Sequence, residues 1–153
     1  MRRHELGLPA RMSRVAIVAT EARLRDALVA LADACLVELA GPLPPPAGPA
    51  LDALRRLEQS RREGVPAPTL GRDAPDLAAL ETAGQPGRIA GEVELQRRAH
   101  AAIRHGSFAA WVGWTPASTL PKLEEQLAAV GAAVVELPRP AWSEPPTSLE
   151  PLR

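Results

Sequence analysis

The sequence predicts an α+β fold in which two strand–helix–strand units share one sheet and place both helices on the same face. Three observations predict it. The phrase ACLVELAGP at 34–42 returns as AAVVELPRP at 132–140, which indicates an internal duplication. Each copy follows a helical pattern of apolar residues, and each of those patterns follows a short apolar run typical of a strand. A chain of 153 residues is also long enough to bury the core of a single domain.

The first unit covers residues 13–41. Its opening run, RVAIVA at 14–19, is apolar on both alternating faces, as in a strand that is covered on two sides. Thr20 can cap the following helix. The apolar residues of that helix recur at helical spacing: Leu24, Ala27, Leu28, Leu31 and Ala34. CLVELAG then alternates with a period of two, and Gly41 with Pro42 ends this second strand.

The second unit covers residues 107–140. Its first strand, SFAAWVGW, is predicted to place Phe108, Ala110, Val112 and Trp114 on one face. TPASTL supplies the start of a helix that tolerates Pro121 only in its first turn and ends at Gly131, and AAVVELP is the last strand. Two right-handed βαβ crossovers in one sheet give a ferredoxin-like two-layer sandwich.

The middle segment, 42–106, differs in character and is predicted to be a short helical insertion. PLPPPAGP favours a stiff spacer, and GQPGRIAG at 84–91 is predicted to be a loop. Two helices are predicted, over 50–64 and 91–106, packing as an antiparallel pair, and DLAAL at 76–80 adds one turn. Residues 1–12 are then an N-terminal extension and 141–153 a proline-rich tail.

Composition excludes several classes of function. The chain has 18 basic and 18 acidic residues, so its net charge of zero argues against a polyanion or an anionic membrane as partner. The apolar run ALVALA at 27–32 is far shorter than the roughly 18–20 residues of a bilayer span. The N-terminus lacks the apolar segment of a signal peptide and Cys35 has no disulfide partner, which together favour the cytoplasm.

The sequence offers no catalytic, cofactor-binding or metal-binding residues. No glycine-rich nucleotide loop is present, and His100 and His105 would lie about 140° apart around a helix. Cys35 has no nearby histidine and is predicted to be a small buried residue. Glu38 and Glu136 occupy equivalent places in the two copies and are predicted to face solvent. We therefore expect a protein that is not an enzyme.

Aromatic and basic residues give the candidate partner-binding positions. Phe108, Trp111 and Trp114 are three residues apart, so they do not share one strand face as RNA-binding aromatics do. Both of these tryptophans are predicted to pack in the core or at its rim. Trp142 stands in the proline-rich tail and suits a partner-facing anchor. The candidate binding residues are Trp142, Pro145, Pro146, Arg97 and Arg98.

Three separated elements resemble, in the same order, the N-terminal cytoplasmic half of subunit I of the V-type (archaeal or vacuolar-type) rotary ATPases, also called subunit a. They are the opening at 13–39, the GWTP of residues 113–116, and PPT followed by Leu149. In that family a strand–helix–strand opening, a GW-P element that begins a second such unit and a PPT-L tail precede the membrane half.

The resemblance implies a stator or scaffold without catalytic residues. Its partners would be the peripheral-stalk subunits and other subunits of a rotary ATPase, at the inner face of the membrane, in support of proton transport by the complex. Here two short helices replace the family's long coiled coil, Cys35 stands where a glycine is expected, and the chain ends where the family enters the membrane. A fragment of a longer subunit and a stand-alone chain both fit. The alternative function is a ferredoxin-like regulatory module that binds a small ligand or a protein partner.

Overall fold

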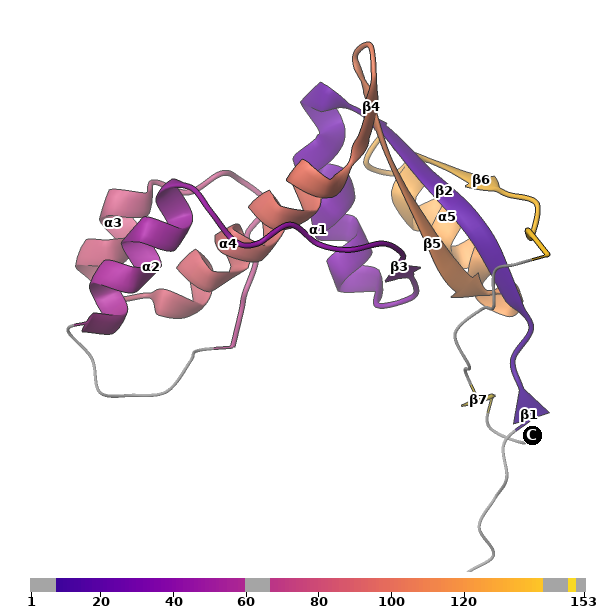
Figure 1. Cartoon of the computed structure of the whole chain (residues 1–153), viewed down its shortest axis with the longest axis horizontal. Helices are drawn as coiled ribbons and strands as arrows, with labels where there is room; N and C mark the ends of the chain where they lie inside the picture. Colours follow the sequence, from indigo (N-terminus) through magenta and orange to yellow (C-terminus); the bar gives the residue numbers. More distant parts are fainter. Residues whose placement is uncertain (1–7, 60–66, 142–148, 151–153) are drawn as a thin grey trace, which may run out of the picture.

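The computed structural model describes residues 8–59, 67–141 and 149–150. Trp142, Pro145 and Pro146 lie outside these ranges. The protein is a mixed α/β structure with a five-stranded antiparallel sheet and, in the described part, five α-helices. Figure 1 shows the sheet and two of its helices as one body, the sheet body, with a helical body extending to one side.

The sheet is built around two long central strands. β2 (Met12–Thr20) and β5 (Phe108–Pro116) pair antiparallel along nine residues each. β6 (Ala133–Glu136) pairs with the free edge of β2. β3 (Glu38–Leu39) and β4 (Ile103–His105) pair with opposite ends of β5, so the order is β3-β5-β2-β6 with β4 beside β5.

Two helices cover one face of this sheet. α1 (Leu24–Ala34) follows a 3₁₀ turn at Glu21–Arg23, and α5 (Leu120–Ala128) follows a 3₁₀ turn at Ala117–Thr119. Pro121 lies in the first turn of α5, as predicted, because a backbone N–H is not needed there. Both predicted strand–helix–strand units are therefore present.

The main core lies between the sheet and these helices. Val15 and Ile17 of β2 are fully buried against it, together with Leu123 and Leu127 of α5. The strand at 107–114 has the predicted alternation, with Phe108, Ala110, Val112 and Trp114 on one face, and that face is the one away from α1 and α5. Ala109 and Trp111 pack in this core, because β5 pairs in a register that sets Trp111 opposite Ile17; the set with Phe108 points to the other face.

The middle segment forms the helical body. It consists of α2 (Pro49–Gln59), α3 (Leu77–Ala83) and α4 (Pro86–Ala101) around a second hydrophobic cluster. The predicted single turn at 76–80 is a seven-residue helix, since the Asp76 carboxylate accepts hydrogen bonds from the backbone N–H groups of Ala78 and Ala79.

Two predictions about this segment are wrong. GQPGRIAG is not a loop, because α4 begins at Pro86, where proline suits the first turn of a helix. The predicted helix at 91–106 ends at Ala101, and its last residues form β4. Ala102 is extended, and Gly106 at φ 59° turns the chain back into β5.

The chain enters and leaves the sheet body at one place. β1 (Leu8–Pro9) pairs antiparallel with β7 (Leu149–Glu150), so the predicted extension and tail meet there (Figure 1). None of the helices in the described ranges is long and apolar enough to cross a membrane.

Candidate functional site

The GWTP element, residues 113–116, builds the joint between the two strand–helix–strand units. A Cβ at Gly113 would lie 2.7 Å from the carbonyl oxygen of Glu38, so only glycine lets β3 approach β5 this closely. The buried Thr115 hydroxyl donates to the carbonyl oxygen of Leu36 at 2.8 Å. The Thr119 hydroxyl donates to the carbonyl oxygen of Pro116 at 2.8 Å. These residues connect elements rather than assemble a reactive site.

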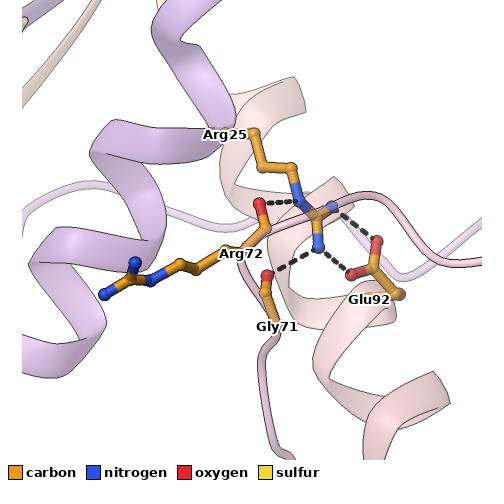
Figure 2. A network of polar contacts seen from close by, with 4 residues as sticks. All are labelled: Arg25, Gly71, Arg72 and Glu92. Carbon is orange, nitrogen blue, oxygen red and sulfur yellow. Dashed lines mark hydrogen bonds and ion pairs between the residues drawn. The ribbon is translucent and has the colours of Figure 1, made fainter. Parts of the chain in front are cut away.

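Arg25 joins the sheet body to the helical body. Its Nη1 and Nη2 atoms donate to the two carboxylate oxygens of Glu92 at 3.0 and 2.5 Å. Its Nη2 also donates to the carbonyl oxygen of Gly71 at 3.0 Å, and its Nε to that of Arg72 at 3.2 Å. Figure 2 shows the guanidinium of α1 held between α4 and the loop before α3.

This Arg25–Glu92 clamp is largely withdrawn from solvent. The Glu92 side chain is 6% exposed and that of Arg25 is 20% exposed. Hydrogen bonding to Glu92 raises the pKa of Arg25, and the cost of burying its charge acts in the opposite direction. A buried bidentate pair fixes orientation, because each charge depends on the other for its hydrogen bonds.

Trp111 fixes the end of α4 to the sheet. Its indole Nε1 donates to the carbonyl oxygen of Arg98 at 2.9 Å, which satisfies one of the unpaired carbonyls at the end of the helix. Trp111 and Trp114 are both buried, which confirms the prediction that they pack in the core or at its rim.

The two candidate arginines of α4 have different surroundings. Arg97 donates from Nε to the carbonyl oxygen of Pro44 and from Nη1 to Glu94, both at 3.0 Å. Arg98 is half-buried, and its guanidinium has no hydrogen-bond or ion-pair partner within the described ranges. Arg97 is thus engaged inside the chain, whereas Arg98 can meet a partner.

Arg98 lies at a cavity of about 590 Å³ between α1, β3 and α4. The cavity is mainly apolar, and Glu38 and Glu94 also line it. Its apolar lining consists of Leu28, Leu31, Ala32, Val37, Leu39, Leu70 and Leu95. A guanidinium and two carboxylates around an apolar hollow suit a partner that offers both an apolar group and charges.

The face of the sheet away from α1 and α5 is the second candidate surface, and we call it the open face. Three large hydrophobic side chains are strongly exposed in the described part of the chain: Ile103 at 64%, Phe108 at 51% and Val135 at 48%. They lie on three different strands, yet the pairing of β2, β4, β5 and β6 places all of them on the open face. Their clustering suggests an interaction surface.

Cys35 is not buried, contrary to prediction. It ends α1 in the left-handed conformation at φ 52° and is exposed, with its Sγ donating to the carbonyl oxygen of Ala32 at 3.0 Å. A helix more often places glycine in this conformation, because glycine has no Cβ.

Glu38 and Glu136 are both exposed, as predicted, but they do not form a pair. Glu38 lies opposite Trp114 on the open face, whereas Glu136 lies opposite Val15 on the helix-covered side. The repeated phrase therefore has a register that differs by one residue between its copies.

Two features are not predicted from the sequence. One is the Arg25–Glu92 clamp, and the other is the place where the segment at 67–71 crosses α4 in the helical body. Arg25 and Glu92 are 67 residues apart, so no local pattern connects them. The crossing had a possible indicator: Gly87 and Gly91 are spaced to lie on one face of α4, and the backbone of 67–71 passes directly over them.

The described residues contain no group of three or more His, Cys, Asp or Glu side chains that could hold a metal ion. Comparison of the chain with known protein families, with curated proteins and with solved structures finds no match.

Proposed function

We propose that this chain is a non-catalytic stator module of a V-type rotary ATPase, equivalent to the cytoplasmic half of subunit I that its sequence resembles. Its role is to hold peripheral-stalk subunits while the rotor turns. We also propose that its sheet body is a ferredoxin-like sandwich. The strand order β3-β5-β2-β6, with α1 and α5 on one face, supports this, since it is the order of two interleaved βαβ units.

The observation that carries the proposal is the continuity of packing between the two bodies. α4 contributes Ile89 and Val93 to the cluster of the helical body and Leu95 to the core of the sheet body. The Arg25–Glu92 clamp adds a second, polar connection. A stator has to transmit load, and close-packed interiors with low compressibility transmit strain well.

The cavity at Arg98 supplies a docking place on the helical side of the molecule. Its leucine-rich lining offers an apolar contact, and the guanidinium of Arg98, which has no partner among the described residues, offers a strong charge-assisted hydrogen bond. Trp142, Pro145 and Pro146 remain proposed partner contacts. Arg97 contributes indirectly, because its bonds to Pro44 and Glu94 hold the wall beside α4.

The proposal predicts that the chain binds purified V-type peripheral-stalk subunits from the same source. Arg98→Ala should weaken this binding about tenfold, because a hydrogen bond to a charged group contributes roughly 1.5–3 kcal/mol. Trp142→Ala should weaken it about thirtyfold or more, as expected of an aromatic anchor. Isothermal titration calorimetry measures both. Lys122→Ala, at an exposed position of α5, is the matched control and should leave the affinity unchanged.

No binding at about 100 μM of either component would contradict the stator function. Equal affinities of the wild-type chain and Arg98→Ala would leave the function standing but remove the cavity from the docking surface.

The size of the same cavity favours a second candidate, a regulatory module that binds a small ligand. A volume near 590 Å³ falls within the roughly 300–1,000 Å³ of small-molecule sites. A metabolite library screened by thermal shift would identify a ligand, since binding to the folded state alone raises Tm. Leu95→Trp, which fills the cavity, should abolish the shift. A ligand found this way, together with no stalk binding, would replace the stator function.

A further inference from the structure

We propose that the open face binds the open face of a second copy of this chain, forming a two-fold symmetric dimer. The proposal is tested separately from stalk binding, because one test measures the binding of stalk subunits and the other the mass of the chain alone. The two surfaces meet at Arg98, which also lines a second pocket with Ile103, Ala110 and Val112 of the open face. Either proposal can fail while the other stands.

The exposed hydrophobic side chains alternate with small ones across the open face. In the central strands, Val18 of β2 pairs with Ala110 of β5, and Ala16 of β2 pairs with Val112 of β5. Residues that lie directly opposite one another on neighbouring strands form a row across the sheet. The large residue is on β2 in one row and on β5 in the next. This diagonal arrangement of large and small side chains is the feature that makes the face complementary to itself.

A two-fold axis that runs parallel to the strands, between β2 and β5, exchanges these two strands between copies. Val18 of one copy then faces Ala110 of the other, and Val112 faces Ala16. In the next row towards the β4–β5 hairpin, Phe108 faces Thr20. Each contact sets a large side chain against a small one, as interdigitated sheet packing requires.

The outer strands follow the same rule. The rotation brings β4 of one copy over β6 of the other, so that Ile103 faces Ala133, because both belong to the row of Ala110 and Val18. Ala40 donates its backbone N–H to the carbonyl oxygen of Val112 at 2.8 Å, which extends the β3 pairing by one row on the open face. Val135 therefore faces Ala40, again a large residue against a small one.

Charge does not oppose this arrangement. Arg14 and Glu38 lie on either side of Trp114 in one row at the end of the face away from the hairpin. Trp114 is already buried within its own chain, and the outer contact of this row sets Glu38 against Leu137, whose backbone N–H donates to the carbonyl oxygen of Arg14. Like charges do not meet in this row, which avoids the repulsion that separates mismatched surfaces.

The size of the face predicts a reversible dimer rather than an obligate one. Strands about 4.8 Å apart that rise about 3.4 Å per residue, with nine residues in each of the two central strands and shorter outer strands, cover roughly 440 Å². This is about half of the roughly 800 Å² that each partner buries in an interface of standard size. We expect a dissociation constant in the micromolar range.

The test is the mass of the whole chain in solution, by sedimentation equilibrium and light scattering from about 1 to 200 μM. The expected result is a concentration-dependent species of twice the chain mass. Ile103→Arg and Val135→Arg should each weaken dimerisation at least about tenfold, because each places a charge in the apolar interface. Ala128→Arg, the same kind of change at an exposed position of α5, is the control and should dimerise like the wild type.

A size exchange tests the geometry itself. Val135→Ala should weaken the dimer, and adding Ala40→Val should restore it, because the large side chain then returns from the other copy. A monomer throughout this range, or a dimer that the arginine variants do not weaken, would overturn the proposal. Loss of stalk binding in Ile103→Arg, with no dimer in the wild type, would also overturn it and assign the open face to the stalk.

Discussion

Arg25 provides the polar part of the attachment between the two bodies, and it predicts a large difference between single and double substitutions. Arg25→Leu leaves the carboxylate of Glu92 buried without a cation, which should lower the free energy of unfolding by about 3–5 kcal/mol. Arg25→Leu with Glu92→Leu should recover most of that loss, because apolar residues replace both charges. Urea unfolding followed by circular dichroism measures each value.

Arg23 provides the matched control. It forms an ion pair with Asp26 on the same helix, but the two side chains are 59% and 39% exposed. Arg23→Leu should therefore change the free energy of unfolding by no more than about 1 kcal/mol. Similar losses in Arg23→Leu and Arg25→Leu would contradict the role assigned to the buried clamp.

A second ion pair predicts the response to acid. Arg56 on α2 hydrogen-bonds both carboxylate oxygens of Glu81 on α3 and thereby lowers the pKa of Glu81 below its ordinary 4.5. A depressed folded-state pKa gives stability that is complete above the unfolded value and is lost as pH falls through the folded one. The free energy of unfolding of the wild type should thus exceed that of Glu81→Gln by a constant amount near neutral pH, and this difference should shrink below about pH 4.5.

Urea unfolding of both proteins at several pH values checks this dependence. Arg56→Gln removes the cation instead of the carboxylate and should abolish the same acid-sensitive component. If the difference in free energy of unfolding between the wild type and Glu81→Gln is unchanged at pH 3, the pair does not contribute to stability through the charge of Glu81.

At the scale of elements, the crossing over α4 predicts that alanine is unfavourable at a helical position. A Cβ at Gly91 would overlap the carbonyl oxygen of Thr69, and one at Gly87 would lie 2.9 Å from that of Ala67. Gly91→Ala should lower the free energy of unfolding by about 1–3 kcal/mol through overpacking. Helix propensity alone would raise it by about 1 kcal/mol. Thermal or urea unfolding distinguishes the two signs.

The control for this substitution is His100→Ala, which introduces the same residue at an exposed position of α4. It should change stability by less than about 0.5 kcal/mol. A stabilised Gly91→Ala protein would mean that the segment at 67–71 does not press on the helix.

The elements that the sequence predicts correctly are those with a long apolar periodicity. β2, β5, α1, α5 and α2 each carry such a pattern. The start of α4 was missed because Gly and Pro in GQPGRIAG favour a loop locally, whereas contact with the backbone of 67–71 requires glycine in a helix. The apolar pattern of the helix predicted at 91–106 continues through Ile103, and only pairing with β5 makes Ile103 part of a strand.

The repeated phrase shows why pairing is harder to predict than element type. Both copies form a strand, but Val37 packs in the main core while its counterpart Val135 lies on the open face. A shift of one residue in register exchanges the two faces of a strand, and nothing within the nine residues of the phrase specifies that register. The open face and its exposed side chains were therefore not predictable from the repeat.

The candidate site was predictable in part. Arg97 and Arg98 are adjacent in sequence, so a helix turns them about 100° apart, and the contacts of the folded chain decide which of them is engaged. Pro44 and Glu94 bind Arg97, and the cavity wall next to Arg98 comes from α1 and β3. Which of the two arginines is bound within the chain depends on which distant segments pack against α4, and local sequence patterns do not encode that.

At the scale of the whole molecule, the proposed contacts divide between two sides. The cavity of Arg98 lies between α1, β3 and α4, and the open face is the side of the sheet away from α1 and α5, with Arg98 close to both. A chain that engages partners on both sides has to keep their relative positions, which the joint at residues 113–116 and the Arg25–Glu92 clamp both favour.

α4 also governs how the molecule comes apart. The same helix completes two hydrophobic clusters, and its last turn is fixed to the sheet by Trp111. Unravelling α4 in one body would remove buried surface from both, so local opening of either body is penalised by the other. The chain should therefore unfold as a single cooperative unit. A destabilising substitution in the helical body should also reduce the order of the sheet.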